Sequence, residues 1–167
     1  MPTEEEFRAR SLRTDAEVDI DEETSQFIVL PVGTNTFACE GGYVREILPH
    51  MPITYVPGMP DYFLGMIHSR GELECVVDLA KVIRLGSTPA VPLNRILMAR
   101  YGVLSSGLLV EYVHDIVDIP KSKISSDVKQ TDKERSEFFV GEFIWKEKLV
   151  VILDLPLILQ RIGGDTA

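Results

Sequence analysis

The side chains that could perform chemistry are few and scattered along the chain. His50, His68 and His114 lie in three separate segments, and none has a second ligand at helical spacing. A metal centre or a catalytic triad would have to be assembled entirely by the fold. No glycine pair opens a helix after a strand, as nucleotide-binding loops require. The sequence therefore favours a protein that is not an enzyme, with no catalytic residues, no bound metal and no cofactor.

Acidic residues and cysteines suggest two further sites. Glu72, Glu74 and Asp78 alternate along an apolar run, a pattern that could hold a divalent cation but is typical of the solvated face of a strand. We therefore expect these carboxylates to face water. Cys39 and Cys75 have no CxxC spacing and no neighbouring histidine, which favours small buried hydrophobic residues over a zinc site.

Two charged residues stand out because their neighbours are apolar. Glu46 lies within the run 44–47, and Arg70 lies within the run 66–71. Charges embedded in strand-like apolar sequence usually have partners, so we expect an ion pair between them. Breaking a partly buried pair would cost on the order of 3 kcal/mol, whereas two independent surface charges contribute at most ~1 kcal/mol.

The elements that must position these residues are short strands. Residues 1–25 are charged and poor in large apolar side chains, which predicts a flexible acidic extension. From residue 26 onward, β-rich runs alternate with turn residues, and helix is expected only over 80–85 and 156–160. Strand spacing of this kind predicts an all-β fold of one or two small barrels. The runs are 27–32, 36–39, 66–69, 72–78, 95–101, 107–113, 138–145 and 149–153.

Composition excludes several classes of partner. The 167 residues are 45% hydrophobic, which is enough for one sizeable core or two small modules that share one. The net charge is −9 and no basic stripe is present, so nucleic acid is not an expected partner. The acidic start does not resemble a signal peptide, and Asp154 and Pro156 interrupt the most apolar run. We expect a cytoplasmic protein that does not insert into the membrane.

Several motifs, in order, resemble those of the CheW family. CheW-like domains carry V-x-E-I, I-T-x-V-P, G-V-I-N-L-R-G followed by P-V-I-D-L, and a late G-L-L-V-D-x-V. The counterparts in this chain are 44–47, 53–57, 65–71 running on to 76–79, and 107–113, followed by a closing segment over 141–155. His68-Ser69 replaces the usual Asn-Leu and Cys75 stands where Pro is common, so we expect the partner-facing surface to be tuned to a particular receptor or kinase set.

The resemblance implies a fold and a function. The fold would be two interleaved five-stranded SH3-like β-barrels with short helices and a hydrophobic seam, over 26–162, followed by a C-terminal tail over 163–167. The function would be that of a non-enzymatic adaptor in bacterial chemotaxis, coupling chemoreceptors (methyl-accepting chemotaxis proteins) to the regulatory domain of a CheA-type histidine kinase. Its place would be the receptor arrays at the inner membrane.

The resemblance also implies which residues bind each partner. The tip of a chemoreceptor would lie in a groove between the barrels, and the kinase would bind a surface on the first barrel. Receptor-binding residues would be Val44, Glu46, Ile47 and Arg70, with Ile96 from the second barrel; kinase-binding residues would be Ile53, Tyr55, Val56, Pro57 and Met59; Gly65, Gly71 and Asp78 would be structural.

Two alternatives remain open at the level of sequence. One is a CheW-like adaptor of a pilus or gliding motility pathway, which genomic neighbours would distinguish. The other is a small β-barrel metal-dependent enzyme that uses the scattered histidines and carboxylates, which a metal analysis of the purified protein would detect.

Overall fold

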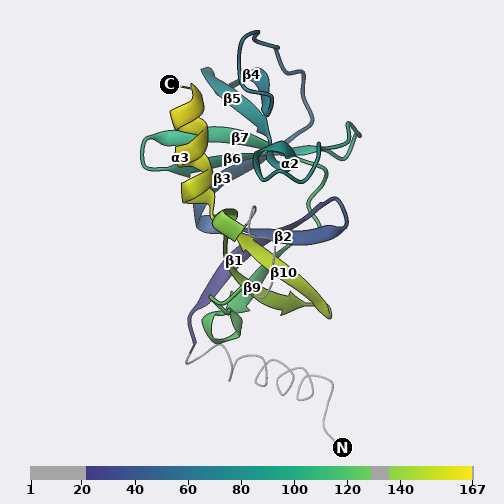
Figure 1. Ribbon diagram of the computed structural model, residues 1–167, viewed down its shortest axis with the longest axis vertical. Helices are drawn as coiled ribbons and strands as arrows, with labels where there is room; N and C mark the ends of the chain where they lie inside the picture. The colour runs from purple at the N-terminus through teal and green to yellow at the C-terminus, as the bar shows by residue number, and fades with distance from the viewer. Residues whose placement is uncertain (1–21, 129–135, 167) are drawn as a thin grey trace, which may run out of the picture.

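Ten short strands and little helix make up the computed structural model, which describes residues 22–128 and 136–166 (Figure 1). The strands are β1 (Thr24–Val32), β2 (Asn35–Glu40), β3 (Val44–Pro49), β4 (Phe63–Ser69), β5 (Glu72–Asp78), β6 (Arg95–Tyr101), β7 (Leu104–Val110), β8 (Asp115–Pro120), β9 (Phe139–Trp145) and β10 (Lys148–Leu153). The helical elements are η1 (Gly41–Tyr43), α2 (Leu79–Val82), η2 (Lys121–Lys123), η3 (Ser136–Phe138) and α3 (Leu155–Thr166).

The strands form two five-stranded sheets, in the orders β8-β1-β2-β10-β9 and β3-β6-β7-β5-β4. The first sheet comes from both ends of the described chain and the second from its middle, so we call them the terminal barrel and the central barrel. Each contains one parallel pair, β10 with β2 and β5 with β7. The predicted architecture of two interleaved five-stranded units is confirmed.

Three apolar clusters divide the core. One lies in the terminal barrel around Phe27 and Phe143, and another lies in the central barrel around Ile67 and Ile96. The third takes side chains from both sheets and from α2 and α3, and we call it the seam cluster. Alternation along the strands explains the division, because neighbouring side chains of a strand point to opposite faces. The expected hydrophobic seam is thereby confirmed.

The C-terminal helix α3 crosses from one barrel to the other. It leaves β10 of the terminal barrel and runs along β6 and β7 of the central barrel (Figure 1). Its buried face enters the seam cluster through Leu155, Ile158, Leu159 and Ile162. The helix continues to Thr166, so the expected tail over 163–167 begins inside its last turn.

Two expectations about strands were wrong or incomplete. Glu74 and Asp78 are buried rather than solvated, because the face of β5 that carries them turns toward the interior of the central barrel. Strand β8 was not expected, because its apolar and polar residues do not alternate; it pairs with β1 and forms an edge of its sheet. The expected extension over 1–25 lies outside the described residues up to residue 21, and Thr24 and Ser25 already pair with β8.

In the described part of the chain, no helix is long and apolar enough to cross a bilayer.

Candidate protein-binding surface

The segment 50–62 joins β3 to β4 and covers the free edge of β4. Thr54 N–H donates to Met66 O and Met66 N–H donates to Thr54 O, both at 2.8 Å. Gly65 makes this close approach possible, because a Cβ at that position would lie 2.1 Å from the Thr54 carbonyl oxygen. Prolines at 52, 57 and 60 restrict the backbone, so the segment is a rigid surface rather than a free loop.

The five residues predicted to bind a kinase all lie on this segment, but they differ in exposure. Tyr55 is 72% exposed and Pro57 is also exposed. Ile53 is half-buried against the central-barrel cluster, while Val56 and Met59 are half-buried against the seam cluster. Tyr55 and Pro57 can therefore meet a partner directly, and the other three anchor the segment to the barrel.

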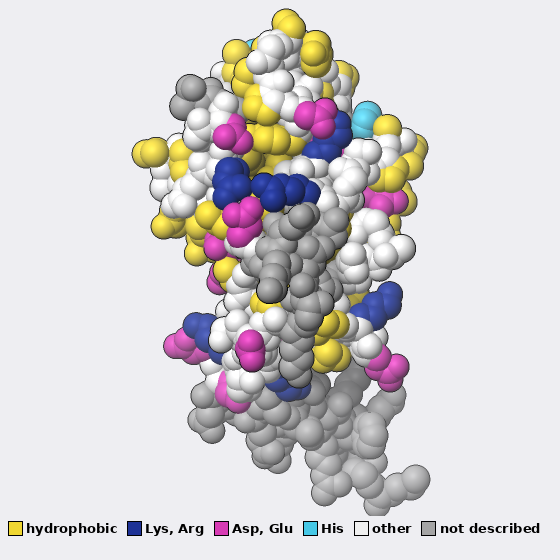
Figure 2. Space-filling view, in the orientation of Figure 1, with side chains coloured by type: hydrophobic (Ala, Val, Ile, Leu, Met, Phe, Trp, Pro, Cys, Tyr) yellow, Lys and Arg dark blue, Asp and Glu magenta, His cyan; other side chains and the backbone are white. Residues whose placement is uncertain are grey.

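An apolar hollow of about 460 Å³ lies beside this segment. Leu73 lines it and is 61% exposed. Figure 2 shows hydrophobic side chains gathered at the top of the view, at the end of the central barrel. The residues lining the hollow are Met51, Pro52, Thr54, Met66, Ile67, His68 and Leu73.

The predicted ion pair between Glu46 and Arg70 is confirmed. Arg70 Nη2 lies 3.1 Å from Glu46 Oε2. Arg70 and Gly71 both have positive φ, 51° and 81°, and form the two-residue turn between β4 and β5. The arginine side chain is 83% exposed and the glutamate 26%, so the pair belongs to the surface class that contributes at most ~1 kcal/mol.

A second ion pair on the same barrel was not predicted from the sequence. Arg45 Nη2 lies 3.5 Å from Glu74 Oε1, and Ser105 Oγ donates to Glu74 Oε2 at 3.2 Å. The register of β3 against β6 shifts between Val44 and Glu46, which makes Arg45 the extra residue of a β-bulge. The bulge lets consecutive residues of one edge strand reach the β4–β5 hairpin.

The residues predicted to bind a receptor are only partly brought together. Val44 and Ile47 are half-buried and border the seam cluster, near Glu46 and Arg70. Ile96 was wrongly placed on a surface and on another barrel: it is fully buried and pairs with Leu48 of β3 within the central barrel. Segment 50–62, which was predicted to bind the kinase, also belongs to the central barrel, although we expected it on the first.

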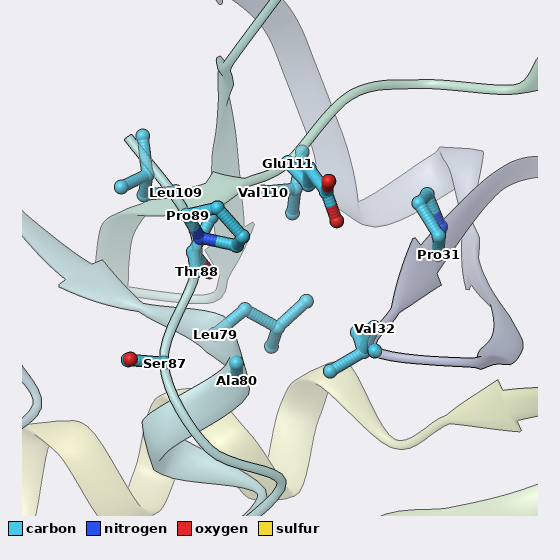
Figure 3. A pocket seen from close by; sticks show the side chains of 11 residues that line it. Pro31, Val32, Leu79, Ala80, Ser87, Thr88, Pro89, Leu109, Val110 and Glu111 are labelled. Carbon is cyan, nitrogen blue, oxygen red and sulfur yellow. The ribbon is translucent and has the colours of Figure 1, made fainter. Parts of the chain in front are cut away.

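A narrow crevice between the barrels holds no small-molecule site (Figure 3). Its volume is about 10 Å³, which is barely room for one water molecule. The carboxylate of Asp78, which is bonded to two lining residues, is already satisfied: it accepts from Ala80 N–H at 3.1 Å, from Thr88 N–H at 2.9 Å and from the Thr88 hydroxyl at 2.6 Å. Within residues 22–128 and 136–166, no group of three or more His, Cys, Asp or Glu side chains could hold a metal ion.

Comparisons with known proteins identify the family. The CheW-like domain model matches residues 26–163. The probable chemotaxis protein CheW of Rhizobium etli is 30% identical over 150 residues, covering 85% of this chain and 92% of the relative. The chemotaxis protein CheW of Rhizobium meliloti is 32% identical over 146 residues, covering 85% and 92%. Both relatives match along most of their length.

The fold has a counterpart among solved structures. The scaffolding protein TtCheW from Thermoanaerobacter tengcongensis superposes with a TM-score of 0.73 over 81% of this chain and 88% of that chain, at 23% identity. Because the matched domain includes both barrels and the surface on segment 50–62, the chain belongs to the CheW-like family of non-enzymatic chemotaxis adaptors.

Proposed function

We propose that this protein couples chemoreceptors to the regulatory domain of a CheA-type histidine kinase, using two surfaces of the central barrel. The observation that carries the proposal is the rigid, apolar segment 50–62, which is held on the β4 edge and stands beside an apolar hollow. Rigid apolar surface gives contact area at low ordering cost, as a protein–protein contact requires. Its work is binding, in receptor arrays at the cytoplasmic side of the inner membrane.

The kinase surface consists of Tyr55 and Pro57, supported by Ile53, Val56 and Met59. Exposure favours Tyr55 as the main contact. Its large aromatic side chain is 72% exposed, so binding can remove much apolar surface from water. Leu73 extends the surface across the hollow.

The receptor surface consists of Val44 and Ile47 at the seam, with Glu46 and Arg70 at its charged end. The tip of a chemoreceptor is a helical hairpin, and an apolar helix face can pack on half-buried aliphatic side chains of this kind. The ion pair supplies orientation rather than much affinity, because the arginine is exposed.

Binding measurements with purified partners test the two surfaces separately. Tyr55→Asp should weaken binding of the kinase regulatory domain at least tenfold and leave receptor binding unchanged. Leu93→Asp is the matched control, because Leu93 is 61% exposed on the same barrel but lies outside segment 50–62. Unchanged kinase binding by folded Tyr55→Asp protein would show that segment 50–62 is not the kinase surface.

The receptor surface needs its own experiment. A cysteine at position 44 should form a cross-link with a cysteine series along a receptor tip fragment, in a pattern that repeats with the helical period. Capture of kinase alone, never receptor, would reject the assignment.

A further inference from the structure

Arg84 occupies a backbone position that usually belongs to glycine. It follows α2 with a φ of 61°. Leu85 N–H donates to Ala80 O at 2.8 Å and Arg84 N–H donates to Lys81 O at 3.1 Å, the two bonds of a Schellman motif. The left-handed residue of this motif is most often glycine, because a Cβ is unfavourable there. An arginine at such a strained position points to a role for its side chain.

The side chain of Arg84 reaches the terminal barrel. Its guanidinium carbon lies 5.9 Å from the centre of the Phe138 ring, and Nη2 lies 3.7 Å from Glu137 Oε1. Arg161 of α3 lies over the same ring at 5.6 Å and its Nη2 is 2.9 Å from Glu137 Oε2. Two guanidinium groups therefore hold one carboxylate and one ring, and we call these four residues the clasp.

The clasp joins elements of both barrels. Glu137 and Phe138 belong to η3, which leads into β9 of the terminal barrel. Arg84 ends the helix that follows β5 of the central barrel. Phe138 is also part of the seam cluster, whose apolar contacts between the barrels are non-directional. Arg161 donates charge-assisted hydrogen bonds to Glu137, and Arg84 adds an ion pair to the same carboxylate. Contacts with this directionality can select one orientation among several that an apolar seam allows.

We propose that Arg84 is a positioning residue: through the clasp it fixes the angle between the two barrels and thereby the exposure of the receptor surface at the seam. The role in receptor binding rests on the function proposed above. Val44 and Ile47 border the seam cluster, so a change of angle changes how far they are exposed. Tyr55 and Pro57, the exposed residues of segment 50–62, do not pack against the seam cluster, so kinase binding should depend on the angle much less.

Distance measurements between spin labels test the positioning role without any partner. Labels at Ser122→Cys on the terminal barrel and Val103→Cys on the central barrel report the angle, since both positions are exposed. The background is Cys75→Ser; Cys39 can stay, because burial raises the pKa of its thiol to about 12 and keeps it from labelling.

Arg84→Gly is the decisive variant, because it removes the clasp arginine while relieving the left-handed backbone. The melting temperature should change by no more than about 2 °C, while the width of the distance distribution should at least double. Glu137→Gln should broaden it as well, since it removes the charge that both arginines share. Lys146→Gly is the matched control: Lys146 is also basic and left-handed, with a φ of 48°, and lies outside the clasp, so its distribution should match the unmodified protein.

Binding separates this inference from the proposed function. Arg84→Gly should weaken binding of a receptor tip fragment about fivefold and change binding of the kinase regulatory domain less than twofold. Unchanged distance distributions in both Arg84→Gly and Glu137→Gln would overturn the positioning role. Failure of the unmodified protein to bind the receptor fragment would instead reject the proposed function, and the distance result would still decide the role of Arg84.

Discussion

The two barrels share the same kinds of turn and the same kind of pairing at a sheet edge. Each has a two-residue turn with positive φ at both positions, Arg70-Gly71 in the central barrel and Lys146-Glu147 in the terminal barrel. In each, the connection that leads into an edge strand pairs with that strand, through Thr54 with Met66 and through Ser125 with Glu142. Parts shared by both barrels therefore serve the fold.

Both barrels also have an aspartate where a strand of the parallel pair ends. Asp78 is the last residue of β5 and Asp154 directly follows β10, and each precedes a helix. Their backbone N–H groups donate to Tyr62 O at 2.8 Å and to Phe138 O at 2.7 Å, which join the end of one strand to the start of its neighbour. Features found in only one barrel, such as the proline-rich segment 50–62 and the ion pairs of Arg45 and Arg70, are the better candidates for binding.

The largest expected effect on stability concerns the glycine that precedes Met66 and the glycine that precedes Glu142. A Cβ at Gly65 would lie 2.1 Å from Thr54 O, and Gly65 has a φ of 148°, whereas a Cβ at Gly141 would lie 2.8 Å from Ser125 O. Gly65→Ala should lower the free energy of unfolding by about 4 kcal/mol and Gly141→Ala by about 2 kcal/mol. Urea unfolding measures both, and equal costs would contradict the difference between the barrels.

The next largest effect on stability is expected at Asp78 and Asp154, whose side chains cap the helices that follow them. Asp78 is 2% exposed and accepts three hydrogen bonds, while Asp154 is half-buried and accepts one, from Leu157 N–H at 3.1 Å. Asp78→Ala should cost about 3 kcal/mol of unfolding free energy, and Asp154→Ala about 1 kcal/mol. Asp78→Asn tests the cause: it keeps the shape and should recover part of the loss.

The exposed ion pair of the central barrel should contribute less. A double-mutant cycle with Glu46→Ala and Arg70→Ala should give a coupling energy below about 1 kcal/mol, because Arg70 is 83% exposed. The coupling should shrink further in 0.5 M salt. A coupling near 3 kcal/mol would mean that the pair is buried in solution.

The smallest effect should be a pH dependence in the terminal barrel. Burial, followed by the charges of Lys148 and Lys146, lowers the pKa of His114 below its usual value. The folded state therefore binds a proton less readily than the unfolded state, so His114 destabilises the fold as pH falls below about 6.5 and has no effect well above it. Lys148→Gln should raise the pKa in an NMR titration, and an unchanged pKa would leave burial and Lys146 as the causes.

Sequence alone predicted most of the strands because their signals are local. Alternating side chains and turn residues such as Arg70-Gly71 depend on neighbours within a few positions. Strand β8 was missed even so, since Asp115 and Asp118 give it the look of a loop. The partner of Glu46 could also be predicted, because a charge in an apolar run needs one.

The sequence could not predict which residues are buried or which barrel each strand joins. Ile96 has the same local pattern whether its strand faces solvent or a core, and only the pairing of β6 with both β3 and β7 places it inside. Glu74 was expected to face water, but the closed sheet places Arg45 and Ser105 beside it.

The sequence by itself determined the all-β class, the turns and the family, because these follow from local periodicity and ordered motifs. Only the tertiary structure decided which strands share a barrel, since the parallel pairs β10 with β2 and β5 with β7 join segments far apart in the chain. It also decided that Arg84 and Arg161 meet at Glu137, because that contact needs both barrels in place. Long-range contacts of this kind leave no periodic signal in the sequence, and the closing of the barrels creates them.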